Sequence, residues 1–331
     1  MNNFEINFDK FPAVRRHNNK LTMQIIDSHS HLWLKQDTVV DGTHLYTTTR
    51  GRSMFFDGER QMLPPFMADG RNTAEIFIAN MDYAQVGGAV VVQEVIDGYQ
   101  NDYLAEVASK YPNRFFVCGM PRLGLENADA EKKISADDIV NDVKALYSRG
   151  FKGIAIPGHR IRRPMADLLP AMKFMEEKQM ILSMCLADNE KQITDFQDVI
   201  TECSNLKIAI GHFGLATTEN WENQILLARN PNVYIESGGI TWLYNSEFYP
   251  YPSAIRAIRR AADEVGIHKL MWGSDYPRTI CAITYKMSYD FIVKSDMLTE
   301  SEKAAFLGNN AANFYGFKDL PKLEYVKNMS E

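Results

Sequence analysis

Short runs of apolar residues recur along the chain and alternate with segments whose apolar positions repeat every three or four residues. Runs that are apolar at nearly every position are typical of strands covered on both faces, as in a parallel sheet. The segments between them are typical of helices that bury one face. The predicted strands cover residues 24–31, 88–94, 114–119, 153–156, 180–186, 206–212, 233–236 and 269–275. The predicted helices cover about 73–85, 101–110, 135–149, 165–178, 191–203 and 253–265, with a further helical segment at 299–317.

Eight apolar strands that alternate with helices predict an α/β protein with a (β/α)8, or TIM-barrel, fold. A doubly wound open sheet is the alternative, but no Gly-x-Gly-x-x-Gly follows a strand, so a dinucleotide-binding version has no support. Ser135 and Asp138 resemble a capping box at the start of the third helix. The prediction is one domain over residues 23–331, preceded by a polar, aperiodic N-terminal extension at residues 1–22.

The regular alternation is interrupted once, directly after the first predicted strand. Residues 32–72 show no clear periodicity but contain several aromatic residues and arginines. Structureless loops longer than about 12–15 residues are usually functional lids or disordered segments, and the aromatic residues favour a packed lid. We therefore predict a lid-like insertion over the barrel mouth that supplies a substrate contact. His44 is the first candidate for that contact, with Arg50 and Arg52 as further candidates.

Polar residues fall where the predicted strands end, which is where the active sites of such barrels lie. The first strand ends in His29 and His31, the sixth in His212 and the eighth in Asp275. Residues two apart in a strand face the same side, so the first two histidines can converge on one ion. In a closed barrel Asp275 lies beside them and His212 faces them. Two imidazoles and one carboxylate are an ordinary ligand set for Zn²⁺ or a related metal.

Each of these residues also has a structural interpretation. His29 and His31 could form a solvated turn, His212 could be a buried or capping histidine, and Asp275 could cap a helix. The coincidence of all four at strand ends favours the metal site. It predicts His29, His31 and Asp275 as metal ligands, with Asp275 and His212 as the catalytic groups.

Further polar residues near strand ends are candidates for substrate binding. Clustered arginines after the fourth strand could hold a carboxylate through paired hydrogen bonds, or form a solvated basic loop. Arg278 follows Asp275 closely and could do the same job. The candidates are His159, Arg160, Arg162, Arg278 and Glu236, with Gln93 and Glu94 as weaker ones.

The amino-acid composition limits the kinds of molecule that this protein is expected to bind. The net charge of −6 argues against binding to nucleic acid or an anionic membrane, and no apolar run approaches the roughly 20 residues that span a bilayer. The N-terminus has no apolar segment typical of a secretory signal. The four cysteines lack CxxC spacing and are typical of reduced thiols in a cytoplasmic protein. The expected partner is a small-molecule substrate, and a homodimer is left open.

Four motifs occur in a characteristic order: Ile-Asp-Ser-His-Ser-His at 26–31, Gly-His-Phe-Gly at 211–214, Gly-Ser-Asp-Tyr-Pro at 273–277 and Leu-Gly-Asn-Asn-Ala-Ala-Asn-Phe-Tyr-Gly at 307–316. Together they resemble the amidohydrolase superfamily over about residues 24–317, and specifically the amidohydrolase-2 branch. The resemblance implies either a lactonase for sugar or dicarboxylate lactones, or a non-oxidative decarboxylase like aminocarboxymuconate-semialdehyde decarboxylase.

One departure from the branch bears on the choice between these activities. Its decarboxylases usually carry a further histidine at the end of the fifth strand, where residues 183–188 read Ser-Met-Cys-Leu-Ala-Asp. Similar lactonases also lack this histidine, and some of them work without a metal. Cys185 could be a replacement ligand or a small buried side chain.

The sequence thus predicts hydrolysis of a small lactone, a sugar-acid or carboxylated cyclic ester. Asp275 would act as general base and His212 would hydrogen-bond the water or the developing oxyanion. Zn²⁺ is the expected metal, with Mn²⁺ and a metal-free mechanism as alternatives. The alternative functions are a metal-dependent decarboxylase and a non-catalytic ligand-binding barrel.

Overall fold

The computed structural model describes residues 23–124, 134–161, 163–327 and 329, so the predicted N-terminal extension lies outside the described residues. Eight parallel strands follow one another around the molecule, each paired with the next along the chain. They are β1 (Ile26–Ser30), β6 (Gly88–Val91), β7 (Phe115–Gly119), β8 (Gly153–Ile156), β9 (Ile181–Met184), β10 (Lys207–Ile210), β11 (Val233–Glu236) and β12 (Leu270–Met271).

Hydrogen bonds between β1 and the residues that follow β12 bring the two ends of this sheet together. Ser28 donates its backbone N–H to the carbonyl of Trp272 at 2.9 Å, and Asp275 donates to the carbonyl of His29 at 2.9 Å. The eight strands therefore form a barrel, and the predicted (β/α)8 fold is confirmed. This junction places Asp275 directly beside the histidines of β1.

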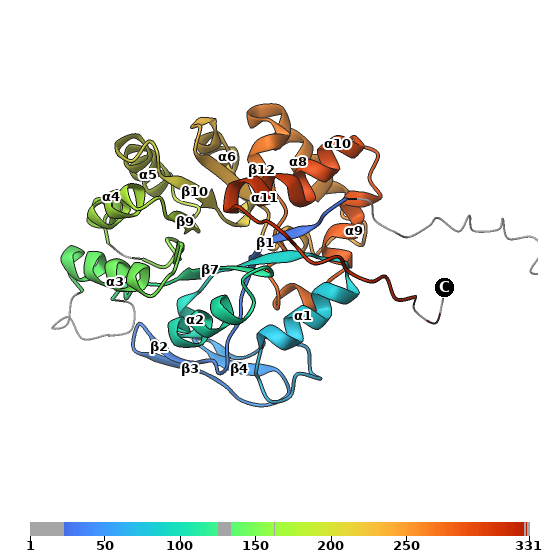
Figure 1. Ribbon diagram of the computed structural model, residues 1–331, viewed down its shortest axis with the longest axis horizontal. Coiled ribbons are helices and arrows are strands. Elements are labelled where there is room, and N and C mark those ends of the chain that lie inside the picture. Colours follow the sequence, from blue (N-terminus) through green and yellow to red (C-terminus); the bar gives the residue numbers. More distant parts are fainter. Residues whose placement is uncertain (1–22, 125–133, 162, 328, 330–331) are drawn as a thin grey trace, which may run out of the picture.

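Helices surround the strands, as the ribbon shows (Figure 1). The capping box predicted at Ser135 and Asp138 is present, with both hydrogen bonds formed. The helix α5 buries Phe196, Val199 and Ile200, the spacing of a single helical face. The helices are α1 (Ala74–Tyr83), α2 (Asn101–Lys110), α3 (Ala136–Ser148), α4 (Leu169–Glu177), α5 (Glu190–Glu202), α6 (Glu222–Leu226), α7 (Ile240–Leu243), α8 (Pro252–Val265), α9 (Met287–Val293), α10 (Glu300–Ala304) and α11 (Asn310–Tyr315). No described helix is both long and apolar enough to cross a membrane.

The barrel interior is filled by one apolar side chain from most strands, and α11 packs against this cluster. The strand residues of the cluster are Ile26, Val90, Cys118, Ala155, Ile181, Ala209 and Met271. Gly308, from the last sequence motif, allows this close approach because a Cβ added there would lie 2.0 Å from the carbonyl oxygen of Gln24. With one end of the barrel packed in this way, the polar residues at the C-terminal strand ends line the open end.

The insertion at residues 32–72 has regular secondary structure, whereas the sequence had predicted an irregular segment. It contains an antiparallel sheet of β2 (Asp37–Val40), β3 (Thr43–Thr47), β4 (Arg52–Phe55) and β5 (Gly58–Gln61), in that order. These strands are short, and most of their residues are exposed or only partly buried, so they lack the apolar run or strict alternation that identifies a buried strand. Asp-Gly pairs at 41–42 and 57–58 were the available signal, since this dipeptide favours tight hairpin turns.

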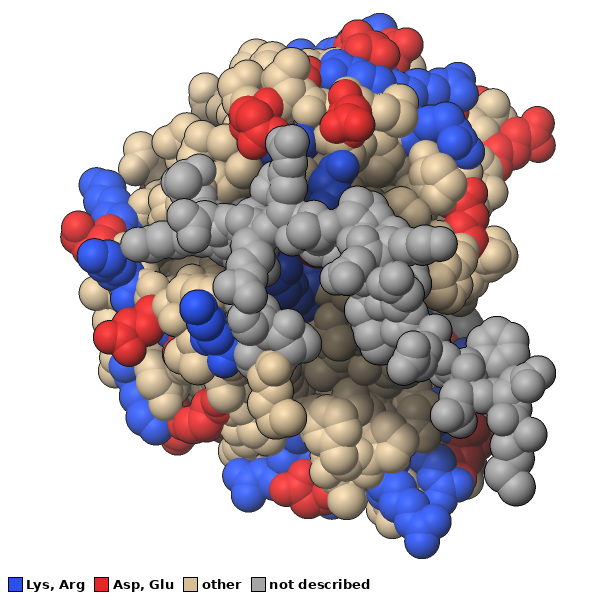
Figure 2. All heavy atoms as spheres, turned by 90° about the vertical axis from the view of Figure 1, so that its right-hand side faces the viewer, with Lys and Arg blue, Asp and Glu red and all other residues tan. Residues whose placement is uncertain are grey.

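Charged side chains of both signs are interspersed on the face that Figure 2 shows. Among the described residues of that face, lysines and arginines form no continuous basic surface of the kind that nucleic-acid binding uses.

Candidate active site

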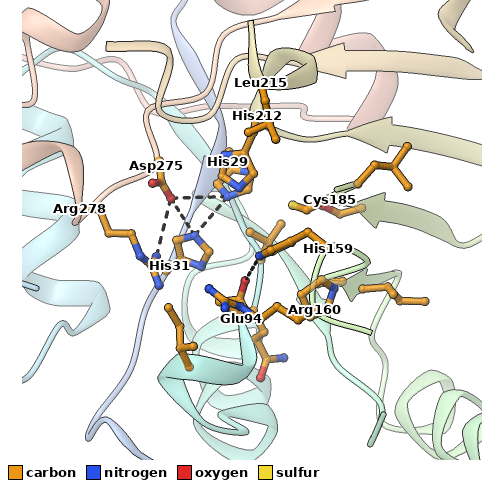
Figure 3. Close-up of a pocket in the computed structure, with 18 of the residues that line it drawn as sticks. His29, His31, Glu94, His159, Arg160, Cys185, His212, Leu215, Asp275 and Arg278 are labelled. Carbon is orange, nitrogen blue, oxygen red and sulfur yellow. Dashed lines mark hydrogen bonds and ion pairs between the residues drawn. The ribbon is translucent and has the colours of Figure 1, made fainter. Parts of the chain in front are cut away.

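A cavity of about 220 Å³ lies at the C-terminal ends of the barrel strands. Its walls combine histidines, acidic residues and arginines with a similar number of apolar side chains (Figure 3). The lining residues are His29, His31, Val92, Gln93, Glu94, Ile96, Ala155, Ile156, Pro157, His159, Arg160, Ser183, Cys185, Leu186, His212, Leu215, Trp242, Asp275 and Arg278.

The two histidines of the first motif point toward one another and toward Asp275 (Figure 3). The Nε2 atoms of His29 and His31 are 3.1 Å apart, and Oδ1 of Asp275 lies 3.0 Å from Nε2 of His31 and 3.7 Å from Nε2 of His29. One ligand atom from each residue falls within 4.8 Å of the others, and all three side chains are buried. The predicted convergence of this group is therefore present.

Glu236, at the end of β11, supports the first of these histidines from behind. Its Oε1 lies 2.7 Å from Nδ1 of His29. Burial raises the pKa of Glu236 to about 8, against the hydrogen bond from the backbone N–H of Gly238, so Glu236 keeps its proton near neutral pH and can donate it to Nδ1 of His29. A cation at Nε2 would draw that proton to Nδ1, the arrangement that orients metal-binding histidines. Glu236 does not line the cavity, which corrects its assignment as a substrate contact.

The donor set fits a divalent transition metal. Burial lowers the pKa of His29 and of His31 to about 4, so both rings are neutral near neutral pH and can offer lone pairs. Nδ1 of His31 is buried without a hydrogen-bond partner among the described residues, and Oδ2 of Asp97 is 3.8 Å away. Coordination through Nε2 would place the ring proton on this orphaned atom, facing a carboxylate. Two imidazole nitrogens and a carboxylate oxygen suit Zn²⁺ and related ions.

Asp275 follows β12 and is 2% exposed. Burial opposes its ionisation, but the hydrogen bond from His31 and the charge of Arg278 outweigh that effect and hold its pKa well below the usual range. Its Oδ2 accepts a 2.9 Å hydrogen bond from the indole N–H of Trp242. Asp275 does not cap a helix, because the next turn begins with Arg278 as its N-cap. Its side chain is thus an ionised carboxylate committed to the site.

His212 lies on the same side of the cavity as His29, and the two rings pack against each other with centroids 4.7 Å apart. Nδ1 of His212 lies 2.9 Å from the carbonyl oxygen of Gly238, which can only accept, so Nδ1 carries the ring proton. Burial lowers the pKa of His212, and its neutral ring therefore has a lone pair at Nε2. Of its two predicted roles, accepting a hydrogen bond from water fits this tautomer, whereas donating to an oxyanion does not. His212 lies outside the metal-capable group.

A family model described as amidohydrolase matches residues 26–317 of the chain. The chain belongs to the amidohydrolase family. This confirms the amidohydrolase-2 membership predicted from the four motifs. No curated protein matches the chain in sequence.

Solved structures of low sequence identity share the fold of this amidohydrolase. A probable 2-pyrone-4,6-dicarboxylic acid hydrolase from Acinetobacter baumannii, with citric acid bound, is 19% identical, with a TM-score of 0.62 over 89% of this chain and 100% of that one. An amidohydrolase from Burkholderia multivorans with bound zinc is 17% identical, with a TM-score of 0.62 over 90% and 100%. The 5-carboxyvanillate decarboxylase from Sphingomonas paucimobilis is 14% identical, with a TM-score of 0.59 over 90% and 100%.

In this amidohydrolase, the wall of the cavity that faces the histidines and Asp275 carries a cluster of charged residues. Oε1 of Glu94 accepts a 2.9 Å hydrogen bond from Nε of Arg160, and Oε2 lies 3.2 Å from Nε2 of His159. Burial opposes ionisation of Glu94, but His159 and Arg160 outweigh it and hold the pKa of Glu94 well below its usual range. His159 and Arg160 thus reach the cavity as predicted, while Arg162 lies outside the described residues.

Arg278 lines the cavity between the two walls and is held by Asp97, which ends the 3₁₀ turn η2 (Val95–Asp97). Nη2 of Arg278 donates to both carboxylate oxygens of Asp97, at 3.0 and 2.8 Å. Nη1 lies 3.7 Å from Oδ1 of Asp275 and has no hydrogen-bond partner among the described residues. Sequence reasoning missed both Asp97 and Trp242, since neither lies at a strand end or in a recognisable motif.

The insertion does not reach the cavity wall directly. His44 lies on β3, where its Nε2 is 2.8 Å from Oδ1 of Asp37, and its side chain is 56% exposed. Residues 32–72 are all described, and the cavity lining includes none of them. The structure therefore does not bring His44 to the site. The insertion supports the site from outside the cavity, since Gln36 donates to Oδ1 of Asp97 at 2.9 Å and Asn72 donates to the carbonyl oxygen of His31 at 2.6 Å.

Cys185 lines the cavity but is not part of the metal-capable group. Burial raises the pKa of its thiol well above the usual value, so the group stays protonated. This favours the small buried side chain over the replacement ligand, because thiols bind metals as thiolates.

Proposed function

We propose that this amidohydrolase opens a small lactone by hydrolysis. The observation that carries the proposal is the convergence of His29, His31 and ionised Asp275 at a cavity of about 220 Å³. Such a cavity suits a single small ring with a few substituents. A base, a metal-capable site and polar groups on the facing wall are the components that hydrolysis of an ester requires.

We infer that His29, His31 and Asp275 hold a divalent metal, with Zn²⁺ as first candidate and Mn²⁺ as second. The bound zinc of the Burkholderia structure supports zinc. A cation there would lower the pKa of a water or polarise the substrate carbonyl. A metal-free mechanism is the alternative, in which Asp275 alone activates the water.

The residues of the chain have distinct proposed roles. Asp275 takes the proton of the attacking water, since it is ionised and buried beside the histidine pair. His212 accepts a hydrogen bond from the same water through Nε2 and so orients it. Arg160 and His159 contact oxygen atoms of the ring substituents from the opposite wall. Arg278 offers Nη1 to the carbonyl oxygen, a donor that His212 cannot supply.

The charge of the cavity bears on the substrate. Arg160 pairs with Glu94, and Arg278 pairs with Asp97, so each arginine already faces one carboxylate. A dicarboxylate would have to compete with both acidic residues. We therefore propose a sugar-acid lactone, with one carboxylate or none, ahead of a dicarboxylate lactone such as the pyrone named for the Acinetobacter relative.

A metal-dependent decarboxylase is the second candidate, favoured by the fold shared with the 5-carboxyvanillate decarboxylase. Against it, β9 ends in Met184 and Cys185 and offers no further histidine. A ligand-binding barrel without catalysis is the third candidate. Ionised Asp275 in the cavity argues against it, because a buried charge without a chemical role is costly.

One experiment separates the three candidates. The metal-loaded protein is incubated with sugar-acid lactones, pyrone carboxylates and aromatic carboxylates, while proton release and carbon dioxide are measured together. Ring opening without carbon dioxide supports the lactonase, and carbon dioxide release from a carboxylate supports the decarboxylase. Binding of a panel compound without turnover, in both the zinc and the manganese form, would support the non-catalytic barrel and overturn the proposal.

A further inference from the structure

His29, His31, His212 and Asp275 form one side of the cavity, the histidine side. One short segment contacts three of these four residues. It runs from Glu236, at the end of β11, to Trp242 in α7. Glu236 holds Nδ1 of His29, and the carbonyl of Gly238 accepts from Nδ1 of His212. Trp242 donates its indole N–H to Asp275. These seven residues lie outside the four family motifs, yet they reach partners on three other strand ends.

Because of the hydrogen bond from Trp242, the two carboxylate oxygens of Asp275 have different partners. Oδ2 is occupied by the indole N–H at 2.9 Å, while Oδ1 faces Nε2 of His31 at 3.0 Å and Nη1 of Arg278 at 3.7 Å. An indole N–H can only donate, so it neither takes a proton nor binds a metal. Its effect is therefore geometric, since it fixes the rotation of the carboxylate about the Cβ–Cγ bond.

The backbone of the segment is shaped to permit this contact. Gly239 has φ of +73°, which L side chains rarely adopt, and a Cβ added there would lie 1.6 Å from Nε1 of Trp242. The indole thus lies so close to Gly239 that a side chain at this position would displace it. This close approach is independent of the hydrogen bond and points to the same conclusion, that the segment is built to bring the indole N–H to Asp275.

We propose that Trp242 is a positioning residue that orients the carboxylate of Asp275, and that Gly239 is the residue that makes this possible. With Oδ2 held by the indole, Oδ1 is directed at the histidine pair, where it can complete the metal-capable group. The effects on catalysis and on metal binding rest on the proposed function, whereas the hydrogen bond itself does not.

Indole NMR tests the contact without any substrate. The chain has four tryptophans, so protein labelled with ¹⁵N-tryptophan gives four indole signals, and Trp242→Phe identifies the one from Trp242. In Asp275→Ala, which removes the acceptor, that signal should shift and its N–H should exchange faster with solvent. The other three signals should keep their positions. An unchanged Trp242 signal in Asp275→Ala would overturn the proposal, whatever the enzyme hydrolyses.

Zinc binding tests the consequence for the site. Trp242→Phe keeps an aromatic ring but loses the donor, and we expect zinc affinity to fall about tenfold or more, as for other groups that orient metal ligands. The matched control is Trp33→Phe, which removes an indole hydrogen bond to the carbonyl of Gly70, away from the cavity. Equal zinc affinity in Trp242→Phe and the parent would contradict the positioning role.

Once a substrate is found, kinetics give a further test. Trp242→Phe should lower kcat by roughly tenfold or more, the scale of a lost hydrogen bond to a charged group, with little change in KM. Gly239→Ala should have the same pattern, because it displaces the indole while keeping the tryptophan. A rise in KM with normal kcat would instead make Trp242 a substrate contact and overturn the positioning role. If no substrate is found, the NMR and zinc results still decide it.

Discussion

The two walls of the cavity are built in different ways. The histidine wall consists of His29, His31, His212 and Asp275, and the charged wall consists of Glu94, His159 and Arg160. In the histidine wall His29, His31 and Asp275 are 1%, 4% and 2% exposed, and each of their side-chain nitrogen and oxygen atoms except Nδ1 of His31 has a partner among the described residues. In the charged wall the side chains of His159 and Arg160 are 27% and 30% exposed, and both contact Glu94.

The difference follows from the backbone that carries each wall. In the histidine wall His29 lies within β1 and His31 follows it directly, and the backbone N–H of Asp275 bonds to the carbonyl of His29, which ties Asp275 to the same strand. His159 and Arg160 lie in the loop after β8. Groups on regular elements are held more tightly than groups on loops. We therefore expect changes in the histidine wall to act on metal binding and kcat, and changes in the charged wall to act on KM.

The largest effect is expected for Asp275→Asn. Asparagine keeps the size of the side chain and one oxygen but cannot take a proton from water. General base catalysis is worth on the order of 10²–10⁴-fold, so kcat should fall by about that factor while KM changes little. Steady-state kinetics on the lactone found in the substrate panel measures this. Near-normal kcat, in a variant whose thermal stability equals that of the parent, would remove Asp275 from the mechanism.

The site should lose its metal at a lower pH than a solvent-exposed histidine site would. Protons compete with metals for imidazole, and burial lowers the pKa of His29 and His31 from 6.5 to about 4. A lower pKa means less competition, so metal should be retained as the pH falls below 6.5 and be lost only near pH 4. Elemental analysis after dialysis over this range measures retention. Loss of metal already near pH 6.5 would show that the histidine wall is not shielded from solvent.

Glu236→Gln should weaken metal binding without touching the ligands. Glutamine has one side-chain acceptor, whereas Glu236 contacts both Nδ1 of His29 and the backbone N–H of Gly238. Loss of such a supporting group typically costs 10–100-fold in metal affinity, and we expect about that range. Competition with a coloured chelator measures it, with the exposed Glu202→Gln as control. Unchanged affinity would mean that the support behind His29 is dispensable.

The smallest effect is expected in the charged wall. Arg160→Met removes the guanidinium but keeps most of the apolar stem, and KM should rise by about tenfold while kcat stays within about a factor of two. The exposed Arg260→Met, which loses a surface pair with Glu222 and a cation–π contact with Trp221, is the control. A lower kcat with an unchanged KM would contradict the assignment of substrate binding to the charged wall and catalysis to the histidine wall.

The insertion, Asp97 and Trp242 show where sequence reasoning fell short. The strands of the insertion are short and mostly exposed or partly buried, and only their Asp-Gly turns distinguished them from irregular chain. Asp97 and Trp242 matter because of what they touch, Arg278 and Asp275, which are 181 and 33 positions away in sequence. The same holds for Glu236, whose place at a strand end was predicted but whose partner, His29, was not.

The sequence by itself determined the strands, most helices, the barrel and the positions of His29, His31, His212 and Asp275. It could do so because hydrophobic periodicity is local, and because a closed barrel places all strand ends at one rim. Tertiary structure alone decided the tautomer of His212, the pairing of each arginine with an acid, and the orientation of Asp275 by Trp242. These depend on side-chain packing between segments far apart in the chain, which no local pattern encodes.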